Sequence, residues 1–199
     1  GDGGRAMNGA QALKSGFARD VLATFGTKMA AAGVGLLTSV LVARSLGPDG
    51  RGAFATVMTL AAIGMQFANL GLHSSNSYYL ARDRSILPAV VANSLAFALV
   101  LGSLAGVLLT GVAWASGVVA SAGAGAVGMA MASIPAGLAY LLLVNLLLPL
   151  QAVAAFNRIE FGLRLVMFAL TGLAFAAMMP SVALMVGASL LAHVYGIAA

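Results

Sequence analysis

The sequence predicts an all-α fold, a polytopic membrane helix bundle of about six transmembrane helices. Charged residues make up 8% of the 199 residues and mean hydropathy is +1.03, whereas about a quarter of the residues in a soluble domain are charged. No Asp, Glu, Lys or Arg occurs in 85–157 or in 165–199. Because backbone groups in lipid must pair within a helix or a closed barrel, and the alternation of barrel strands is lacking, we expect the spans to be helices.

The N-terminal segment has the pattern of a helix that lies in the membrane interface. Leu13, Phe17, Val21 and Phe25 repeat at four-residue spacing, while charged side chains take the other faces. We therefore expect a polar N-terminus over 1–20, in which this helix starts, and a transmembrane domain behind it.

Glycine, serine and proline mark the turns between the expected spans. The run 85–157 would be about 110 Å long as one helix, against a hydrocarbon core of about 30 Å, so it must fold back. The Gly/Ser/Ala tract 116–128 is the expected turn, and Pro180 is expected to turn the run 165–199. The domain 21–199 is thus expected to hold spans near 21–42, 53–72, 88–114, 125–148, 163–179 and 181–199.

Lys and Arg in the expected loops predict that the N-terminus lies inside, because inner loops carry an excess of both. The outer side would hold only Arg44 and Arg51, with Lys28 set aside as lying within a span. The inner side would hold the larger set, Arg5, Lys14, Arg19, Arg82, Arg84, Arg158 and Arg164.

Polar residues inside the expected spans each need a partner or a water-filled cavity, because an isolated polar group in lipid is costly. For the amides, two interpretations stay open: hydrogen bonds between helices, or one hydrated side of the bundle. Lys28 is expected either to snorkel to the inner interface or to point into a cavity. Tyr140 lies mid-span and is expected to find a partner for its hydroxyl. The candidate cavity amides are Gln66, Asn69, Asn93 and Asn145.

Small residues at four-residue spacing predict close helix contacts. Gly102 and Gly106 form such a pair in the third span, and Gly128, Ala132 and Ala136 form a row in the fourth.

Enzymatic chemistry is not expected. There is no cysteine, His73 and His193 are too isolated for a metal site, and no phosphate-cradling glycine loop is present, so we expect neither catalysis nor a cofactor. Ser116 and His193 suggest an intramembrane serine protease, but Trp114 stands where that serine motif has glycine. The net charge of +5 indicates membrane orientation and no nucleic-acid partner.

Two stretches resemble a known family. The stretch 37–82 contains "ARSLGP", "GRGAFA" and "NLGLHSSNSYYLAR", and 147–165 reads "LLPLQAVAAFNRIEFGLRL". Both resemble the N-terminal half of bacterial polysaccharide flippases of the O-antigen type, in the multidrug/oligosaccharidyl-lipid/polysaccharide exporter superfamily.

That resemblance implies one lobe of a two-lobe transporter that moves a lipid-linked oligosaccharide across the cytoplasmic membrane by alternating access, for assembly of the cell envelope. The partners it implies are the lipid-linked pyrophosphate glycan, the bilayer and a missing C-terminal lobe. The substrate-binding positions would be Arg44, Arg51 and Lys28, because guanidinium groups bind phosphate bidentately. In the competing interpretation, Arg44 and Arg51 flank a solvated turn and lie at lipid phosphates.

Two other functions stay open. A multidrug or small-cation exporter of the same superfamily would favour acidic residues within its spans, and none is expected inside the spans given above. A non-transporting component of polysaccharide assembly would need no hydrated cavity.

Overall fold

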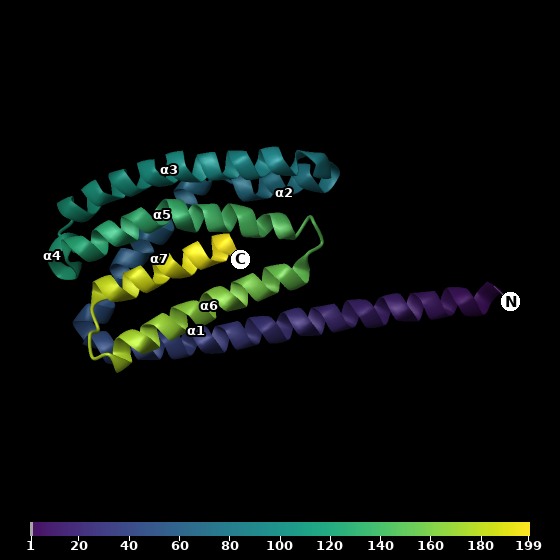
Figure 1. Cartoon of the computed structure of the whole chain (residues 1–199), viewed down its shortest axis with the longest axis horizontal. Coiled ribbons are helices and arrows are strands. Elements are labelled where there is room, and N and C mark those ends of the chain that lie inside the picture. The colour runs from purple at the N-terminus through teal and green to yellow at the C-terminus, as the bar shows by residue number, and fades with distance from the viewer. Residues whose placement is uncertain (1) are drawn as a thin grey trace.

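The chain is an all-α helix bundle, as predicted (Figure 1). The computed structural model describes the backbone of residues 2–199 and the side chains of residue 22 and of 24–199. Within that range there is no strand, and two short 3₁₀ turns, η1 (Arg84–Ile86) and η2 (Asn145–Leu147), accompany the helices. The α-helices are α1 (Asp2–Asn69), α2 (Leu72–Arg82), α3 (Leu87–Ala115), α4 (Val118–Ala122), α5 (Ala124–Val144), α6 (Val153–Ala176) and α7 (Val182–Ala198).

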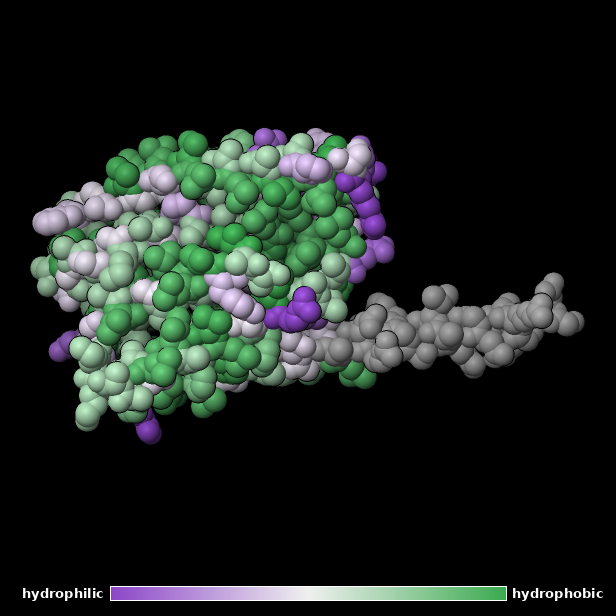
Figure 2. Space-filling model, in the orientation of Figure 1, coloured by the Kyte–Doolittle hydropathy of each residue, from purple (hydrophilic) through white to green (hydrophobic). Residues whose placement is uncertain are grey.

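Several of these helices are long and apolar enough to cross a membrane. In the described part of the chain there are four such stretches, Thr24–Asn69, Arg84–Ala115, Ala124–Leu147 and Val153–Ala176, while Val182–Ala198 is apolar but shorter. Figure 2 shows a broad apolar surface, with the hydrophilic residues in view mostly toward its two ends. A multi-pass membrane protein follows from this, while the count of about six spans and the orientation stay predictions.

Helix α1 is broken at Gly47, which divides it into a first leg (2–46) and a second leg (48–69). Gly47 has φ 69° and ψ −176°, a conformation open essentially to glycine alone. Arg51 Nη2 lies 3.5 Å from Ser39 Oγ, to which it donates, although residues twelve apart on a straight helix are about 18 Å apart. The chain therefore turns back at Gly47, and the second leg lies beside the first.

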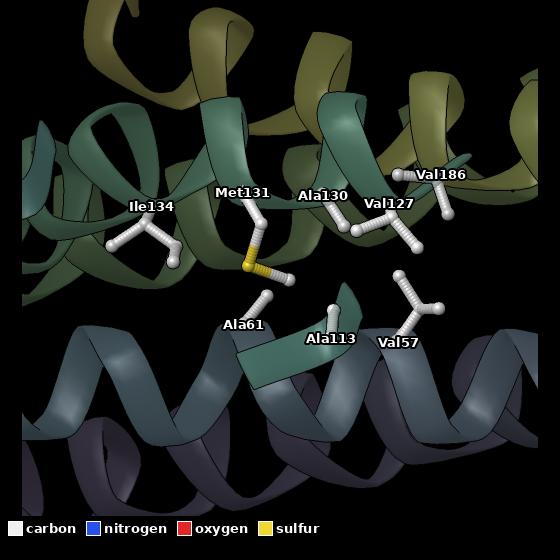
Figure 3. Close-up of a cluster of buried hydrophobic side chains, with 8 residues drawn as sticks. All are labelled: Val57, Ala61, Ala113, Val127, Ala130, Met131, Ile134 and Val186. Carbon is white, nitrogen blue, oxygen red and sulfur yellow. The ribbon is translucent and has the colours of Figure 1, made fainter. Parts of the chain in front are cut away.

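Helix α5 is at the centre of the bundle, packed against α1, α3 and α7. Figure 3 shows the cluster that joins them, in which side chains of the second leg point toward α5. Most of its members are small or branched, so the helices approach closely. The cluster consists of Val57, Ala61, Ala113, Val127, Ala130, Met131, Ile134 and Val186.

The small-residue pair of α3 makes the predicted close contact, whereas the row in α5 does not. A Cβ on Gly102 would lie 2.6 Å from Pro135 Cα, and one on Gly106 would lie 2.8 Å from the Met131 carbonyl oxygen. In contrast, a Cβ on Gly128 would meet nothing within 4 Å, and Ala132 is exposed. The expectation for the row Gly128, Ala132, Ala136 was wrong because α5 presents another face, that of Met131 and Pro135, to α3.

Two helical boundaries differ from those expected. Helix α6 begins at Val153, ten residues before the expected start of the fifth span, so Arg158 and Glu160 lie on a helix and not in a loop. The chain leaves the second leg at Leu70 and Gly71, both with positive φ, and forms α2 where a loop was expected. The expected interfacial face of Leu13, Phe17 and Val21 lies outside the described side chains.

Polar contacts dock α2 onto the bundle. Asn76 Nδ2 donates to Ser94 Oγ of α3 at 2.9 Å, and Ser77 Oγ donates to the carbonyl of Asn145 at 3.4 Å. Leu80 is fully buried between them, packed with Val90 and Leu146. At this end of the bundle, these polar groups therefore serve to hold α2 against its neighbours.

Candidate functional site

Helix α6 packs along the first leg of α1, and a cavity of about 270 Å³ lies between them. The lining positions recur every three or four residues on both helices, so one face of each helix supplies the wall. We call this space the α1–α6 cavity. It is lined by Thr27, Lys28, Ala31 and Ala32 of α1 and by Phe156, Asn157, Glu160, Phe161 and Arg164 of α6.

The charged groups of the α1–α6 cavity are not paired with one another. Lys28 and Arg164 contribute two positive charges and Glu160 one negative charge, a balance of 2 − 1 = +1. Within the described residues, neither Lys28 nor Arg164 has a carboxylate within 4.0 Å of its nitrogens. Both side chains are exposed, and two cations that line one space without such a partner make this space a candidate site for an anion.

Glu160 is held instead by a tyrosine of α5. The Tyr140 hydroxyl donates to Glu160 Oε1 at 2.8 Å, which confirms that Tyr140 finds a partner inside the bundle. The Tyr140 ring is fixed from α7: His193 packs edge-on at 5.9 Å between ring centroids, and a Cβ on Gly196 would lie 2.5 Å from Tyr140 Cδ2. The absence of a side chain at Gly196 therefore makes room for the ring.

The α6 side of the cavity is tied to α1 by uncharged groups as well. Asn157 Nδ2 donates to Thr24 Oγ1 at 3.1 Å. Arg164 Nη1 reaches across to α1, where it lies 3.5 Å from the position that a Cβ on Gly35 would take. Arg164 thus lies against α1, although Glu160 stands one helical turn before it on its own helix.

A second cavity, of about 300 Å³, continues the same line toward the turn at Gly47. Both legs of α1 and Met167 of α6 border this cavity. Arg51 is the charged residue in its lining. Lys28 and Ser39, the hydrogen-bond partner of Arg51, are about 17 Å apart along the first leg. The lining residues are Gly35, Thr38, Ser39, Val42, Arg51, Phe54, Ala55 and Met167. We call the two cavities with Lys28, Arg164 and Arg51 the basic seam.

The basic residues expected at the site separate into two groups. Lys28 lines the α1–α6 cavity and Arg51 lines the second cavity. Arg44 is exposed on the last turn of the first leg and contributes to neither. The seam therefore brings together two of the three expected cations and adds Arg164, which was expected to act as a topology determinant.

The four amides do not converge on one hydrated face. Asn69 is buried and bonded to His73, with Nδ2 and Nδ1 2.8 Å apart, and Asn145 Nδ2 donates to the Leu141 carbonyl at 2.8 Å. Gln66 and Asn93 are exposed, and neither lines the basic seam. Asn69 and Asn145 thus bond to partners only four residues away in the chain.

Sequence reasoning missed Asn157, Glu160 and Arg164 as site residues. Their signal was present: the spacing 157, 160, 164 puts all three on one face of a helix. This helical spacing was overlooked because a stretch with three charges in seven residues, 158–164, has the composition of a loop.

The two histidines do not form a metal site with other described side chains. Among the described residues there is no group of three or more His, Cys, Asp and Glu side chains placed to hold a metal ion. Ser116 Oγ donates to the Val112 carbonyl at 2.8 Å, while His193 packs on Tyr140, so the two residues of the protease alternative have different partners.

The family resemblance rests on the quoted sequence stretches alone. Comparison of the chain with protein-family models, with curated proteins and with solved structures found no match.

Proposed function

We propose that the chain is one lobe of a membrane transporter that flips a lipid-linked oligosaccharide across a bacterial cytoplasmic membrane by alternating access. Its basic seam binds the pyrophosphate that joins lipid and glycan. The observation that carries this proposal is the α1–α6 cavity, in which Lys28 and Arg164 line a common space and have no carboxylate partner among the described side chains. Guanidinium and ammonium groups bind phosphate oxygens through charge-assisted hydrogen bonds.

The length of the seam supports a ligand with more than one anionic group. Lys28, Arg164 and Arg51 supply three positive charges against the single carboxylate of Glu160, a balance of 3 − 1 = +2. A pyrophosphate that moves along the seam meets one cation after another. Lys28 comes first, then Arg164, whose Nη1 lies beside Gly35, and then Arg51.

A second candidate is a small-cation exporter, which the position of Glu160 favours. Glu160 lies on α6 within an apolar stretch long enough to span a membrane, contrary to the expectation that no span holds an acidic residue. Against this candidate, Tyr140 already occupies one oxygen of Glu160, and the two neighbouring cations leave the cavity with a positive balance. The cavity electrostatics therefore favour an anionic ligand.

Binding measurements separate the two candidates. The chain in lipid nanodiscs is titrated with geranylgeranyl pyrophosphate, with geranylgeraniol as the uncharged control and with tetraphenylphosphonium as the cationic probe. We expect the pyrophosphate to bind, the alcohol to bind at least tenfold more weakly, and pyrophosphate affinity to fall with added salt because exposed charges are screened. Preferential binding of the cation would support the exporter, and equal binding of pyrophosphate and alcohol would contradict the anion site of the flippase.

Replacing Arg51 tests whether the seam extends to the second cavity. Arg51→Gln is expected to weaken geranylgeranyl pyrophosphate binding by about tenfold, since one charge-assisted contact is lost. Arg84→Gln is the matched control, because Arg84 is exposed in η1 and lines neither cavity. If Arg44→Gln weakens binding more than Arg51→Gln does, the anion binds at the turn and not along the seam.

A further inference from the structure

Glu160 stands beside the cations of the α1–α6 cavity and yet is kept from pairing with them. A glutamate four residues before an arginine on a helix is the favoured arrangement for an ion pair. Glu160 and Arg164 have this spacing and line the same cavity, but no nitrogen of Arg164 lies within 4.0 Å of the carboxylate. The two side chains are therefore apart, and each has another contact.

One contact holds the Glu160 carboxylate and another holds the Arg164 guanidinium. Tyr140 donates its hydroxyl to Glu160 Oε1 at 2.8 Å and so draws the carboxylate toward α5. Arg164 extends in the other direction, with Nη1 against Gly35 of α1. Glu160 and Arg164 both line the cavity, and Lys28 lines it from α1.

The Tyr140 hydroxyl has a fixed position because its ring is enclosed. Tyr140 is buried, packs with Val144 and Ile159, and lies against the backbone of Gly196 and the edge of His193. The ring cannot move aside without disturbing α7, so the hydrogen bond to Glu160 is built into the packing of α5, α6 and α7.

We propose that Tyr140 is a positioning residue for the anion site: it holds Glu160 away from Arg164 and Lys28, so that both cations stay free for the pyrophosphate. This inference rests on the proposed function, because it concerns the same cavity and the same anionic ligand. Without the hydroxyl, Glu160 turns to Arg164 one turn away and competes with the ligand as an internal anion. The Tyr140 hydroxyl thereby keeps the site in its anion-accepting form.

A cycle of three variants tests this role by binding of geranylgeranyl pyrophosphate in nanodiscs. Tyr140→Phe is expected to weaken binding by about tenfold, because the released carboxylate pairs with Arg164. Glu160→Gln removes the negative charge from the cavity lining and is expected to bind a few-fold more tightly than the unsubstituted chain, because the nearby carboxylate no longer repels the ligand. In the double variant Tyr140→Phe/Glu160→Gln, the loss caused by Tyr140→Phe is expected to vanish, because there is no longer an anion to release.

The control is Tyr195→Phe, which removes a hydroxyl from a neighbouring tyrosine on α7. The Tyr195 hydroxyl has no hydrogen-bond partner among the described residues, so pyrophosphate affinity is expected to stay within about twofold. Thermal unfolding of every variant shows whether the fold is kept. If Tyr140→Phe does not fold, tighter binding by Glu160→Gln alone supports the competition and unchanged or weaker binding overturns it.

The outcomes separate the inference from the function on which it rests. Affinity of Tyr140→Phe equal to that of the unsubstituted chain overturns the positioning role, and so does a double variant as weak as Tyr140→Phe, since a purely structural loss is not rescued. Absence of pyrophosphate binding by the unsubstituted chain overturns the proposed function and this inference with it.

Discussion

Replacing Lys28 and Arg164 together by glutamine is expected to weaken pyrophosphate binding by about a hundredfold. Each is a cation that lines the α1–α6 cavity and has no carboxylate partner in the described part of the chain. A hydrogen bond to a charged group contributes about 1.5–3 kcal/mol, and about 1.4 kcal/mol corresponds to a factor of ten in affinity. Two such contacts therefore account for about two orders of magnitude at moderate salt. Isothermal titration of the chain in nanodiscs with geranylgeranyl pyrophosphate measures the change.

The matched control for this pair is Arg158→Gln. Arg158 lies on the same helix as Arg164 and is exposed as Arg164 is, but it does not line the cavity, so its replacement changes the net charge without changing the site. If Arg158→Gln weakens binding as much as the double replacement does, the ligand responds to overall charge, and the cavity is not the binding site.

Substituting Gly102 by alanine is expected to lower the free energy of unfolding by about 1–3 kcal/mol, the usual cost of overpacking a close contact. The added Cβ would lie 2.6 Å from Pro135 Cα, a backbone atom that cannot rotate away, so α3 must move off α5. Since α3 and α5 form the most extensive helix pair of the bundle, the displacement affects its centre. Unfolding in a mixed-micelle denaturant titration measures the loss.

Gly111→Ala provides the comparison on the same helix. A Cβ at Gly111 meets nothing within 4 Å, and alanine is about 0.8–1.0 kcal/mol more favourable than glycine in a helix interior. Gly111→Ala is therefore expected to leave stability unchanged or to raise it slightly. An equal loss in both variants would show that the α3–α5 contact is not the reason for the effect at Gly102.

The fold class and the Gly102–Gly106 contact were predictable from sequence, because each rests on a strong local signal. Long charge-free runs leave helices in lipid as the only solution, and two small residues on one face allow close approach whatever the partner. The turn back between the first two helices was also predictable from the glycines and the proline near Gly47. The row of Gly128, Ala132 and Ala136 shows the limit of this signal, since spacing gives a face but not the neighbour that covers it.

The basic seam was only partly predictable, because its charges are tolerated through contacts distant in sequence. Hydropathy assigns Glu160 to a loop and Arg164 to the first turn of a span, whereas α6 includes both well inside its length. Glu160 is accommodated by Tyr140, twenty residues earlier, and Asn157 by Thr24, more than one hundred residues earlier. Neither partner can be inferred from composition. The amides Asn69 and Asn145 differ in this respect, because their partners lie only four residues away.

The break at Gly47 bears on how the chain is inserted during its synthesis. As one straight rod, the apolar stretch Thr24–Asn69, 46 residues, would be about 69 Å long, more than twice the thickness of a hydrocarbon core. Because the chain bends back at one glycine, its two legs can leave the translocon as a preformed pair. The favourable transfer of the apolar surface of both helices into lipid then offsets the free-energy cost of moving the short charged turn across the membrane. A single backbone conformation at Gly47 thus makes this stretch short enough for the bilayer to accept.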